Sequence, residues 1–306
     1  MKSKRNKQKN YNSFFKIDEL IETNLDKIEQ FKSNPDELLG LSTGFPKLNS
    51  ITLGLQNSNL IVFASRPGIG KTSLALNIAR NVLIEENVPV AIFSLEMTGN
   101  QISMRLLLSG ARIDLYGLAN KRIGAKEWRK LSDGGGELID RPLFIDATPN
   151  ISLTEIHIKA SHLKKTLGLG LLVIDYIQLL KPSNLGTENS KIVDIARSLK
   201  TLAKELNIPV IALSQLDRHG ENQSDNRQPL LSDFGKYDPL VQHADIVGFI
   251  HRKQVQNQNT RYSHKKTAKI IIAKNRNGAT GTAYMNFLGQ YTRFEELSRG
   301  SYDEFK

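Results

Sequence analysis

The sequence contains no cysteine among its 306 residues. This absence excludes disulfide frameworks, thiolate nucleophiles, cysteine-ligated zinc and iron–sulfur clusters. The six histidines do not show the spacing of metal ligands. Any chemistry therefore falls to carboxylates, lysines, arginines and backbone groups.

Long hydrophobic runs are missing as well. The longest apolar run, Leu167 to Leu180, is too short to span a bilayer and carries Asp175. No signal-peptide pattern follows Met1. We therefore expect a soluble, unsecreted protein with no membrane partner.

Positive charge is in surplus, with 42 Lys+Arg against 31 Asp+Glu and a formal net charge of +11. Such a surplus favours a polyanionic partner, although net charge reports on non-specific attraction rather than on mechanism. The length alone suggests about two domains, but single α/β domains of roughly 250 residues are common. The pattern along the chain has to decide the number of domains.

The first 35 residues lack the pattern of a globular core. Residues 1–13 hold five cations and almost no apolar residue, which predicts a disordered basic tail. Residues 14–35 predict an amphipathic linker helix that ends at Asn34-Pro35, because apolar residues recur every three or four positions. Its apolar face is buried either within the chain or on another subunit, and we favour the second. The stripe consists of Phe14, Ile17, Ile21, Leu25, Ile28 and Phe31.

Residues 36–297 alternate short apolar runs with helical patterns, which predicts one α/β domain with a mainly parallel sheet. The last three runs lie close together without helices, so we expect an antiparallel C-terminal extension. Residues 298–306 form a tail, and Asp217–Pro229 and Gln254–Lys266 are expected to be mobile surface loops. The runs are Leu60–Ala64, Val88–Leu95, Leu143–Asp146, Leu171–Ile174, Val210–Leu213, Ile246–Ile250, Lys269–Ala273 and Ala283–Phe287. The helical segments include Thr72–Ile84, Leu153–Leu167 and Asn189–Leu206.

The segment SRPGIGKT follows an apolar run and opens a helical pattern, the context that a phosphate-binding loop requires. Glycines let backbone N–H groups surround a β-phosphate, Lys71 places a cation between phosphates, and the Thr72 hydroxyl can ligate Mg²⁺. The usual pattern begins with glycine, and Ser65 stands there. The alternative is a chance Gly/Lys turn before a helix. The expected nucleotide-binding residues are Ser65, Arg66, Pro67, Gly68, Ile69, Gly70, Lys71, Thr72 and Ser73.

Three further polar residues follow apolar runs. Asp175 is placed to hold Mg²⁺, and Glu96 to deprotonate the water that attacks a γ-phosphate. Gln215 is placed to bond the γ-phosphate and report its loss. Each residue also has a simpler interpretation: Asp175 as a turn residue, Glu96 as a solvated glutamate and Gln215 as an ordinary polar side chain.

Five motifs in order resemble the C-terminal motor domain of DnaB-type replicative DNA helicases. They are SRPGIGKTSLALNIARN, FSLEM, LLVIDYIQLL, IALSQLDR and IIIAKNRNGATGT, and the similarity runs from about Ile17 to Phe287. The resemblance implies a RecA-like fold and a homohexameric ring around single-stranded DNA. It also implies ATP hydrolysis with Mg²⁺ at subunit boundaries, driving 5′-to-3′ unwinding of forked DNA in replication.

The resemblance also assigns roles to residues of this sequence. Lys71 and Thr72 take the phosphate and Mg²⁺ roles, and Asp175 is the metal carboxylate. Glu96 is the general base and Gln215 the sensor. Lys274 and Arg276, in AKNRNG, resemble the pair that reaches into a neighbouring subunit's nucleotide, where a guanidinium neutralises charge on the transferred phosphoryl group. Without the family, AKNRNG would be interpreted as a basic turn.

The sequence departs from the family pattern in three places. After Ser232-Asp233 the usual Arg-Glu-Ser-Gly run is replaced by Phe234-Gly235-Lys236-Tyr237. We expect Lys236 and Arg252 to be the nearest cations to the DNA channel. Asp217–Pro229 looks looser than the family's basic segment. About forty residues precede the motor, so we expect the N-terminal collar that engages primase to be absent, which leaves primase and loader partners open.

Two other functions remain open from the sequence. One is a RecA-like ATPase of recombination or regulation that does not unwind DNA, and the other is a non-catalytic DNA-binding remnant. The AKNRNG pair and the linker helix disfavour the first, and the retained site residues disfavour the second. The richness in Asn, Lys and Ile suggests an AT-rich genome, so a bacterial or phage-infected cytoplasm and a plastid stroma are all compatible.

Overall fold

The computed structural model describes residues 16–33, 38–114, 124–181, 187–216, 227–252 and 266–297. The chain divides into two compact units, Met1–Leu38 and Leu39–Lys306. Within the described residues, the first unit contains helix α1 (Ile17–Ser33), and the second contains a single large sheet with its covering helices.

The bounds of the remaining elements are as follows. The helices of the second unit are α2 (Pro46–Thr52), α3 (Lys71–Glu85), α4 (Gly99–Ala111), α6 (Ala125–Gly136), α7 (Leu153–Leu167), α8 (Glu188–Leu206) and α9 (Asp238–His243), with 3₁₀ turns η1 (Ile177–Leu179), η2 (Leu231–Tyr237) and η4 (Gly289–Tyr291). The strands are β1 (Leu60–Ser65), β2 (Val90–Ser94), β3 (Leu143–Asp146), β4 (Leu171–Asp175), β5 (Val210–Gln215), β6 (Ile246–Arg252), β7 (Lys266–Asn275), β8 (Gly281–Leu288) and β9 (Arg293–Glu296).

Helix α1 confirms the helix that the apolar spacing predicts. Asp18 and Glu19 stand in its first turn and Lys32 in its last, where each charge complements the helix dipole. Ile17 and Leu25 on the apolar stripe are 65% and 58% exposed. The basic tail 1–13 and Phe14 lie outside the described residues. The described part of the stripe is therefore apolar surface of the unit that contains α1.

The sheet has the order β3-β2-β4-β5-β1-β6-β7-β8-β9. Along this order, the first six strands, β3 through β6, pair in parallel with their neighbours. The strands from β6 through β9 pair antiparallel. This order confirms the predicted α/β class with an antiparallel C-terminal extension. The parallel strands are joined through helices, as parallel connections require.

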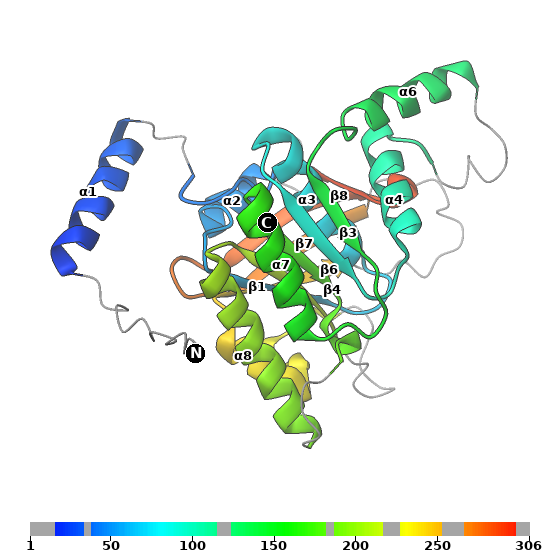
Figure 1. The fold of residues 1–306 in the computed structure, drawn as a ribbon. Coiled ribbons are helices and arrows are strands. Elements are labelled where there is room, and N and C mark those ends of the chain that lie inside the picture. Colours follow the sequence, from blue (N-terminus) through cyan, green and yellow to red (C-terminus); the bar gives the residue numbers. More distant parts are fainter. Residues whose placement is uncertain are drawn as a thin grey trace, which may run out of the picture. The chain divides into compact units, whose positions relative to one another are not determined.

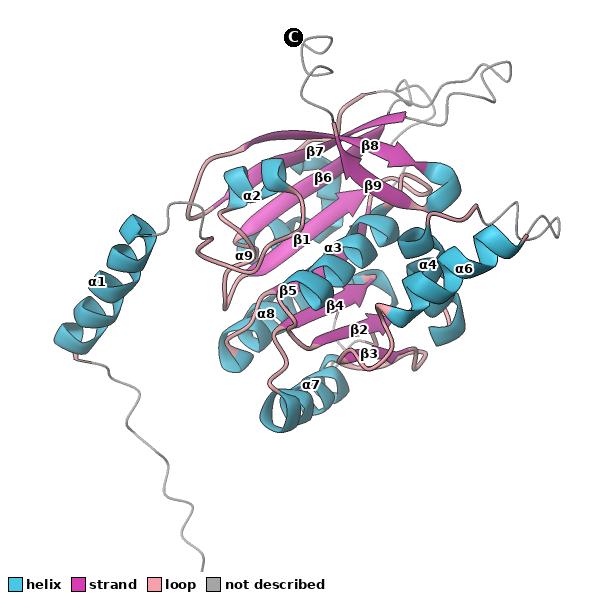
Figure 2. Ribbon diagram, turned by 90° about the horizontal axis from the view of Figure 1, so that it is seen from above, coloured by secondary structure: helices cyan, strands magenta, loops and turns pink. Residues whose placement is uncertain are grey.

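Both faces of the parallel part are buried, so its strands are apolar at every position rather than at alternate ones. In β1, Ile61 and Phe63 belong to the core on the side of α3, whereas Leu60, Val62 and Ala64 belong to the core on the side of α8. Figures 1 and 2 show the resulting layers, with α3 over one face of the sheet and α7 and α8 over the other.

Several elements differ from the sequence expectation. Strand β9 is short and polar, with the sequence RFEE, and helices α2, α4, α6 and α9 were not predicted. Helix α4 starts at a capping box in which Thr98 accepts from Gln101 N and the Gln101 side chain accepts from Thr98 N. The tail 298–306 and most of the two predicted loops, residues 217–226 and 254–265, lie outside the described residues.

Among the helices that the structure describes, none combines the length and the apolar character needed to cross a membrane.

Gly248 lies in β6 where the sheet leaves no room for a side chain. A Cβ there would sit 2.6 Å from the Phe63 ring. We expect Gly248→Ala to lower the free energy of unfolding by about 1–3 kcal/mol through overpacking. Gly136→Ala on α6 is the matched control, because a Cβ there meets nothing within 4 Å. Equal unfolding midpoints for both variants in urea would contradict this reasoning.

Candidate functional site

Polar residues gather where the carboxyl ends of four neighbouring strands meet. β2, β4, β5 and β1 are consecutive in the sheet. Ser94 pairs with Asp175 at one end of this group, and Ser65 pairs with Gln215 at the other. Glu96 follows β2 by two residues. The structure therefore brings the polar residues that the sequence placed at strand ends to one edge.

The SRPGIGKT segment joins β1 to α3 as a tight loop. Gly68 and Gly70 adopt positive φ angles of 74° and 112°, a region that residues with a Cβ avoid. Gly70 is the N-cap of α3, so the free N–H groups of the first turn of α3 face the loop. This geometry is a ready site for phosphate.

Thr72 and Asp175 are in direct contact. The Thr72 hydroxyl donates to Asp175 Oδ2 at 2.6 Å, while the buried Oδ1 atom has no hydrogen-bond partner in the described part of the chain. Burial raises the pKa of Asp175, and the Thr72 hydrogen bond and the charge of Lys71 oppose that rise. A carboxylate oxygen beside a hydroxyl suits Mg²⁺, so these residues fit the ion that the sequence analysis expects here.

Lys71 is a buried cation at the floor of this site. Its Nζ atom lies 4.3 Å from the centre of the Tyr176 ring. Burial lowers the pKa of Lys71, and the charges of Asp175 and Glu96 oppose that effect. The buried ammonium group is thus available to an anion that enters the site.

The phosphate loop, Glu96 and Gln215 line a cavity of about 430 Å³, a volume typical of small-ligand sites. The Ile69 side chain is an exception among the predicted binding residues, because it is packed in the core beneath the loop. Only its backbone can face a ligand. The lining residues are Ser65, Arg66, Pro67, Gly68, Gly70, Lys71, Thr72, Ser73, Glu96, Met97, Arg105, Gln215, Phe287, Gly289 and Thr292.

Two residues in this region had no predicted role. Arg105 on α4 lines the cavity and faces Asp175 closely enough for its charge to lower that pKa. Gln178 holds Gln215 in place: its Nε2 donates to Gln215 O at 2.9 Å and its Oε1 accepts from Gln215 N at 3.3 Å. Gln178 lies in the LLVIDYIQLL motif, but Arg105 belongs to a helix that the periodicity did not reveal.

Lys274 and Arg276 lie at the opposite edge of the sheet from this cavity. β7 runs antiparallel to β6, and its last residue, Asn275, pairs with Ile246 at the start of β6. β1 has six residues, at about 3.3 Å each, so the two edges are roughly 20 Å apart. The pair therefore cannot reach the cavity of its own chain.

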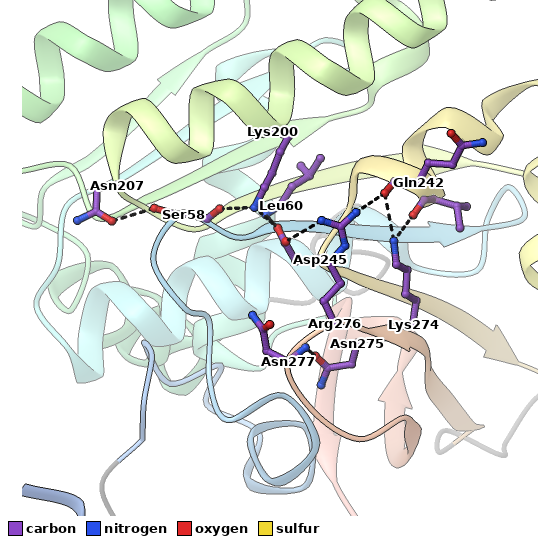
Figure 3. A network of polar contacts seen from close by, with 11 residues as sticks. Ser58, Leu60, Lys200, Asn207, Gln242, Asp245, Lys274, Asn275, Arg276 and Asn277 are labelled. Carbon is purple, nitrogen blue, oxygen red and sulfur yellow. Dashed lines mark hydrogen bonds and ion pairs between the residues drawn. The ribbon is translucent and has the colours of Figure 1, made fainter. Parts of the chain in front are cut away.

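Polar contacts hold this pair against the end of α9 (Figure 3). Lys274 Nζ donates to Val241 O at 2.6 Å, and Arg276 donates to Gln242 O at 2.6 Å. Burial and the neighbouring charge of Arg276 lower the pKa of Lys274. AKNRNG spans the end of β7 and the turn that follows it, and both of its cations fasten this segment to α9.

The two residues expected to contact DNA lie in different settings. Lys236 on η2 is exposed and forms an ion pair with Glu188 at 2.6 Å. Arg252 instead lies at the phosphate loop, where it donates to Gly68 O at 3.0 Å and stacks 4.1 Å from the centre of the Phe287 ring. Arg252 takes this position because the end of β6 adjoins the loop after β1, and its contact with DNA stays a prediction.

The sheet order, the phosphate loop and the strand-end carboxylates define a P-loop NTPase with a RecA-like fold. The model of the DnaB-like helicase C terminal domain matches residues 40–296, and the chain belongs to this family.

Curated relatives agree with this assignment. The chain is 41% identical to the replicative DNA helicase DnaB of Geobacillus stearothermophilus and 40% identical to the replicative DNA helicase DnaC of Bacillus subtilis (strain 168), each over 294 residues. A probable replicative DNA helicase of Trieres chinensis is 40% identical over 296 residues. These alignments cover 95%, 95% and 94% of this chain but 64% of each relative, so the chain spans about two-thirds of their length.

Solved structures show the same fold. The ATPase domain of G40P superimposes with a TM-score of 0.83 and 33% identity, covering 93% of this chain and all of that one. A DnaB-like replicative helicase, studied with its interactions with primase, gives a TM-score of 0.80 and 32% identity, covering 93% of this chain and 68% of that one.

The position of Arg252 generates a prediction about nucleotide binding. Removing a charged donor from Gly68 O loosens the phosphate loop, and such hydrogen bonds contribute about 1.5–3 kcal/mol. We expect Arg252→Ala to weaken the binding of a fluorescent ATP analogue roughly tenfold or more. Lys236→Ala is the control and should leave nucleotide affinity unchanged.

The salt dependence of DNA binding separates the two residues further. When one contact with a DNA phosphate is lost, the slope of log binding constant against log salt concentration becomes flatter by about one unit. That flattening is expected for Lys236→Ala. If Arg252→Ala flattened the slope and left nucleotide affinity intact, Arg252 would be the DNA contact instead.

Proposed function

We propose that this chain is the motor of a replicative DNA helicase that hydrolyses ATP between adjacent copies of itself in a hexameric ring. One observation carries the proposal: the phosphate loop and the Lys274–Arg276 pair lie at opposite edges of one sheet. The chain thus carries both halves of a nucleotide site, but the halves are too far apart to meet. A second copy of the chain completes the site. A closed ring lets every copy do so.

In the proposed reaction, Lys71 and the N–H groups of the phosphate loop bind the phosphates of ATP. Thr72 and Asp175 would hold Mg²⁺, which supplies charge neutralisation on the phosphate oxygens. Glu96 takes the proton of the attacking water, and Gln215, held by Gln178, contacts the γ-phosphate. Arg276 of the next copy stabilises the charge that develops in the transition state, with Lys274 beside it.

The DNA substrate is proposed from chemistry and from relatives. A net charge of +11 suits a polyanion, and the similar proteins are named replicative DNA helicases. Translocation 5′ to 3′ on single-stranded DNA and unwinding of forked duplexes follow from that family. Lys236 is the proposed contact, and it would exchange an exposed ion pair with Glu188, which costs little, for a DNA phosphate. A primase is a proposed partner because a solved DnaB-like relative interacts with one.

We also propose that α1 is a linker that packs on a neighbouring copy. Its exposed apolar stripe supports this role, because a stripe of this kind is stabilised by burial. The proposed domains follow: a tail at 1–13, the linker helix at 14–35, the motor at 36–297 and a tail at 298–306.

A RecA-like ATPase that does not unwind DNA is the main competing function. Both proteins would hydrolyse ATP in response to DNA. Strand displacement on a forked duplex, measured alongside DNA-stimulated ATPase activity, separates them. Hydrolysis without displacement would contradict the helicase proposal, and loss of both activities would favour a DNA-binding remnant.

Binding and chemistry should separate in two variants of the nucleotide site. Lys71 contacts ground-state phosphates, whereas Glu96 acts on water during the reaction. We expect Glu96→Gln to bind ATP and DNA normally while ATP turnover falls by orders of magnitude. Lys71→Ala should lose ATP binding as well. If Glu96→Gln hydrolysed ATP at a near-normal rate, Glu96 would not be the general base.

Mixing two inactive chains tests whether Arg276 acts in trans. Lys71→Ala is defective as the nucleotide holder, and Arg276→Ala is defective as the donor. Some interfaces of the mixture pair an intact phosphate loop with an intact arginine, so ATPase activity should return in part. An arginine of this kind contributes roughly 10³–10⁵ in rate. Labelled chains confirm that subunits exchange. If the mixture then regains no ATPase activity, and the Arg276→Ala chain is active by itself, the assignment of Arg276 as the arginine that acts in trans is wrong.

Deleting residues 14–32 tests the linker proposal. The sedimenting species should shift from a ring towards monomers, because the apolar contact between copies is lost. Circular dichroism should show that the motor stays folded. A truncated chain that remained hexameric would place the helix within its own subunit.

A further inference from the structure

We propose that Asp245, with the carboxyl end of α9, is the positioning element that sets Lys274 and Arg276 for the neighbouring subunit's nucleotide. This inference rests on the proposed action of the pair in trans, and it names a residue outside the five sequence motifs. Asp245 stands between α9 and β6, at the same edge of the sheet as the pair.

A β-bulge turns Lys274 towards α9. Val247 pairs with Lys274 and Gly248 pairs with Ile272, so Ala273 has no opposite residue. Ile272 belongs to the core on the α3 side, whereas Ala273 and Lys274 both face the α9 side. Two successive side chains thus share one face, which regular alternation does not allow. Bulges re-aim side chains in this way next to active sites.

The last carbonyls of α9 receive both cations. Lys274 Nζ lies 2.6 Å from Val241 O and 3.3 Å from Gln242 O. Arg276 reaches Gln242 O at 2.6 Å. The carboxyl end of a helix carries unsatisfied carbonyl groups and partial negative charge, so it attracts cations. The end of α9 therefore restrains the direction of both side chains.

Asp245 anchors the other side of the arginine and is itself rigidly held. Its Oδ2 atom accepts from Leu60 N at 2.8 Å and from Lys200 Nζ at 2.6 Å. Its Oδ1 atom lies 3.8 Å from Arg276 NH1, and its backbone carbonyl accepts from Arg276 N at 2.9 Å. The Asp245 side chain is only 7% exposed. The carboxylate thus links Arg276 to the first residue of β1.

The arrangement leaves the arginine able to act on a second molecule. The Arg276 side chain is 47% exposed, and its guanidinium has five N–H donors. The contacts with Asp245 and Gln242 use part of the N–H donors in the guanidinium plane, so the exposed donors remain for a phosphate. Holding the group before the reaction lowers the entropic cost of placing it, and a displacement of about 1 Å costs on the order of 10² in rate.

The test is Asp245→Asn, which keeps an acceptor for Leu60 N and removes the charge facing Arg276. ATP turnover should fall about tenfold to a hundredfold, while binding of a fluorescent ATP analogue stays unchanged. Asp133→Asn, an exposed aspartate on α6, is the matched control and should keep full turnover. A second variant, Asp245→Asn with Lys200→Met, also removes the half-buried lysine charge that loses its carboxylate partner, and it should show the same loss if the single variant folds poorly.

Mixing experiments distinguish a positioning role from a structural one. If Asp245 serves the donor pair, Asp245→Asn should regain activity when mixed with Lys71→Ala, whose donor is intact. It should not regain activity with Arg276→Ala, because both chains then lack a working donor. If Asp245 only supported the nucleotide site of its own chain, Asp245→Asn should regain activity with Arg276→Ala and not with Lys71→Ala.

The outcomes separate this inference from the proposed function. One outcome is that Lys71→Ala regains ATPase activity when mixed with Arg276→Ala but not when mixed with Asp245→Asn. This result would overturn the inference about Asp245 and would still support an arginine that acts in trans. Full turnover in Asp245→Asn alone would overturn it as well. No recovery in the reference mixture, with exchange confirmed, would overturn the trans arginine and with it this inference.

Discussion

The structure depends on the direction of its parallel strands. Five neighbouring parallel pairings place every carboxyl end at one edge of the sheet and every amino end at the other. The phosphate loop, Glu96, Asp175 and Gln215 lie at carboxyl ends, so one edge collects the groups that bind and hydrolyse ATP under the proposed function. This is the general position of ligand sites in open α/β sheets.

The antiparallel extension reverses that direction and brings two cations to the other edge. β7 enters at the carboxyl edge and ends at the amino edge, where Lys274 and Arg276 emerge beside α9. A seventh parallel strand would have carried them to the edge that holds the phosphate loop. Under the proposed function, the same reversal makes each copy dependent on the next, because no chain contains a complete site.

Elements with strong local patterns were predictable. The apolar runs of the core strands and the loop SRPGIGKT carry their structure in adjacent residues, and helix α7 has the bounds that its periodicity predicts. β9 and α9 were not predictable, because RFEE and DPLVQH are short and their stability comes from packing. The ring centre of Phe294 in β9, for example, lies 4.7 Å from that of Phe287 in the neighbouring strand β8. A local sequence pattern does not reveal this contact between strands.

The class of fold and the candidate residues of the nucleotide site were predictable from the sequence alone, since both predictions depend on local spacing and residue type. Only tertiary packing shows which of those residues meet. It brought Arg252 to Gly68, Arg105 to the cavity near Asp175, and Asp245 between Lys200 and Arg276. Each contact joins residues from different elements, so it exists only after the strands have paired and the helices have packed.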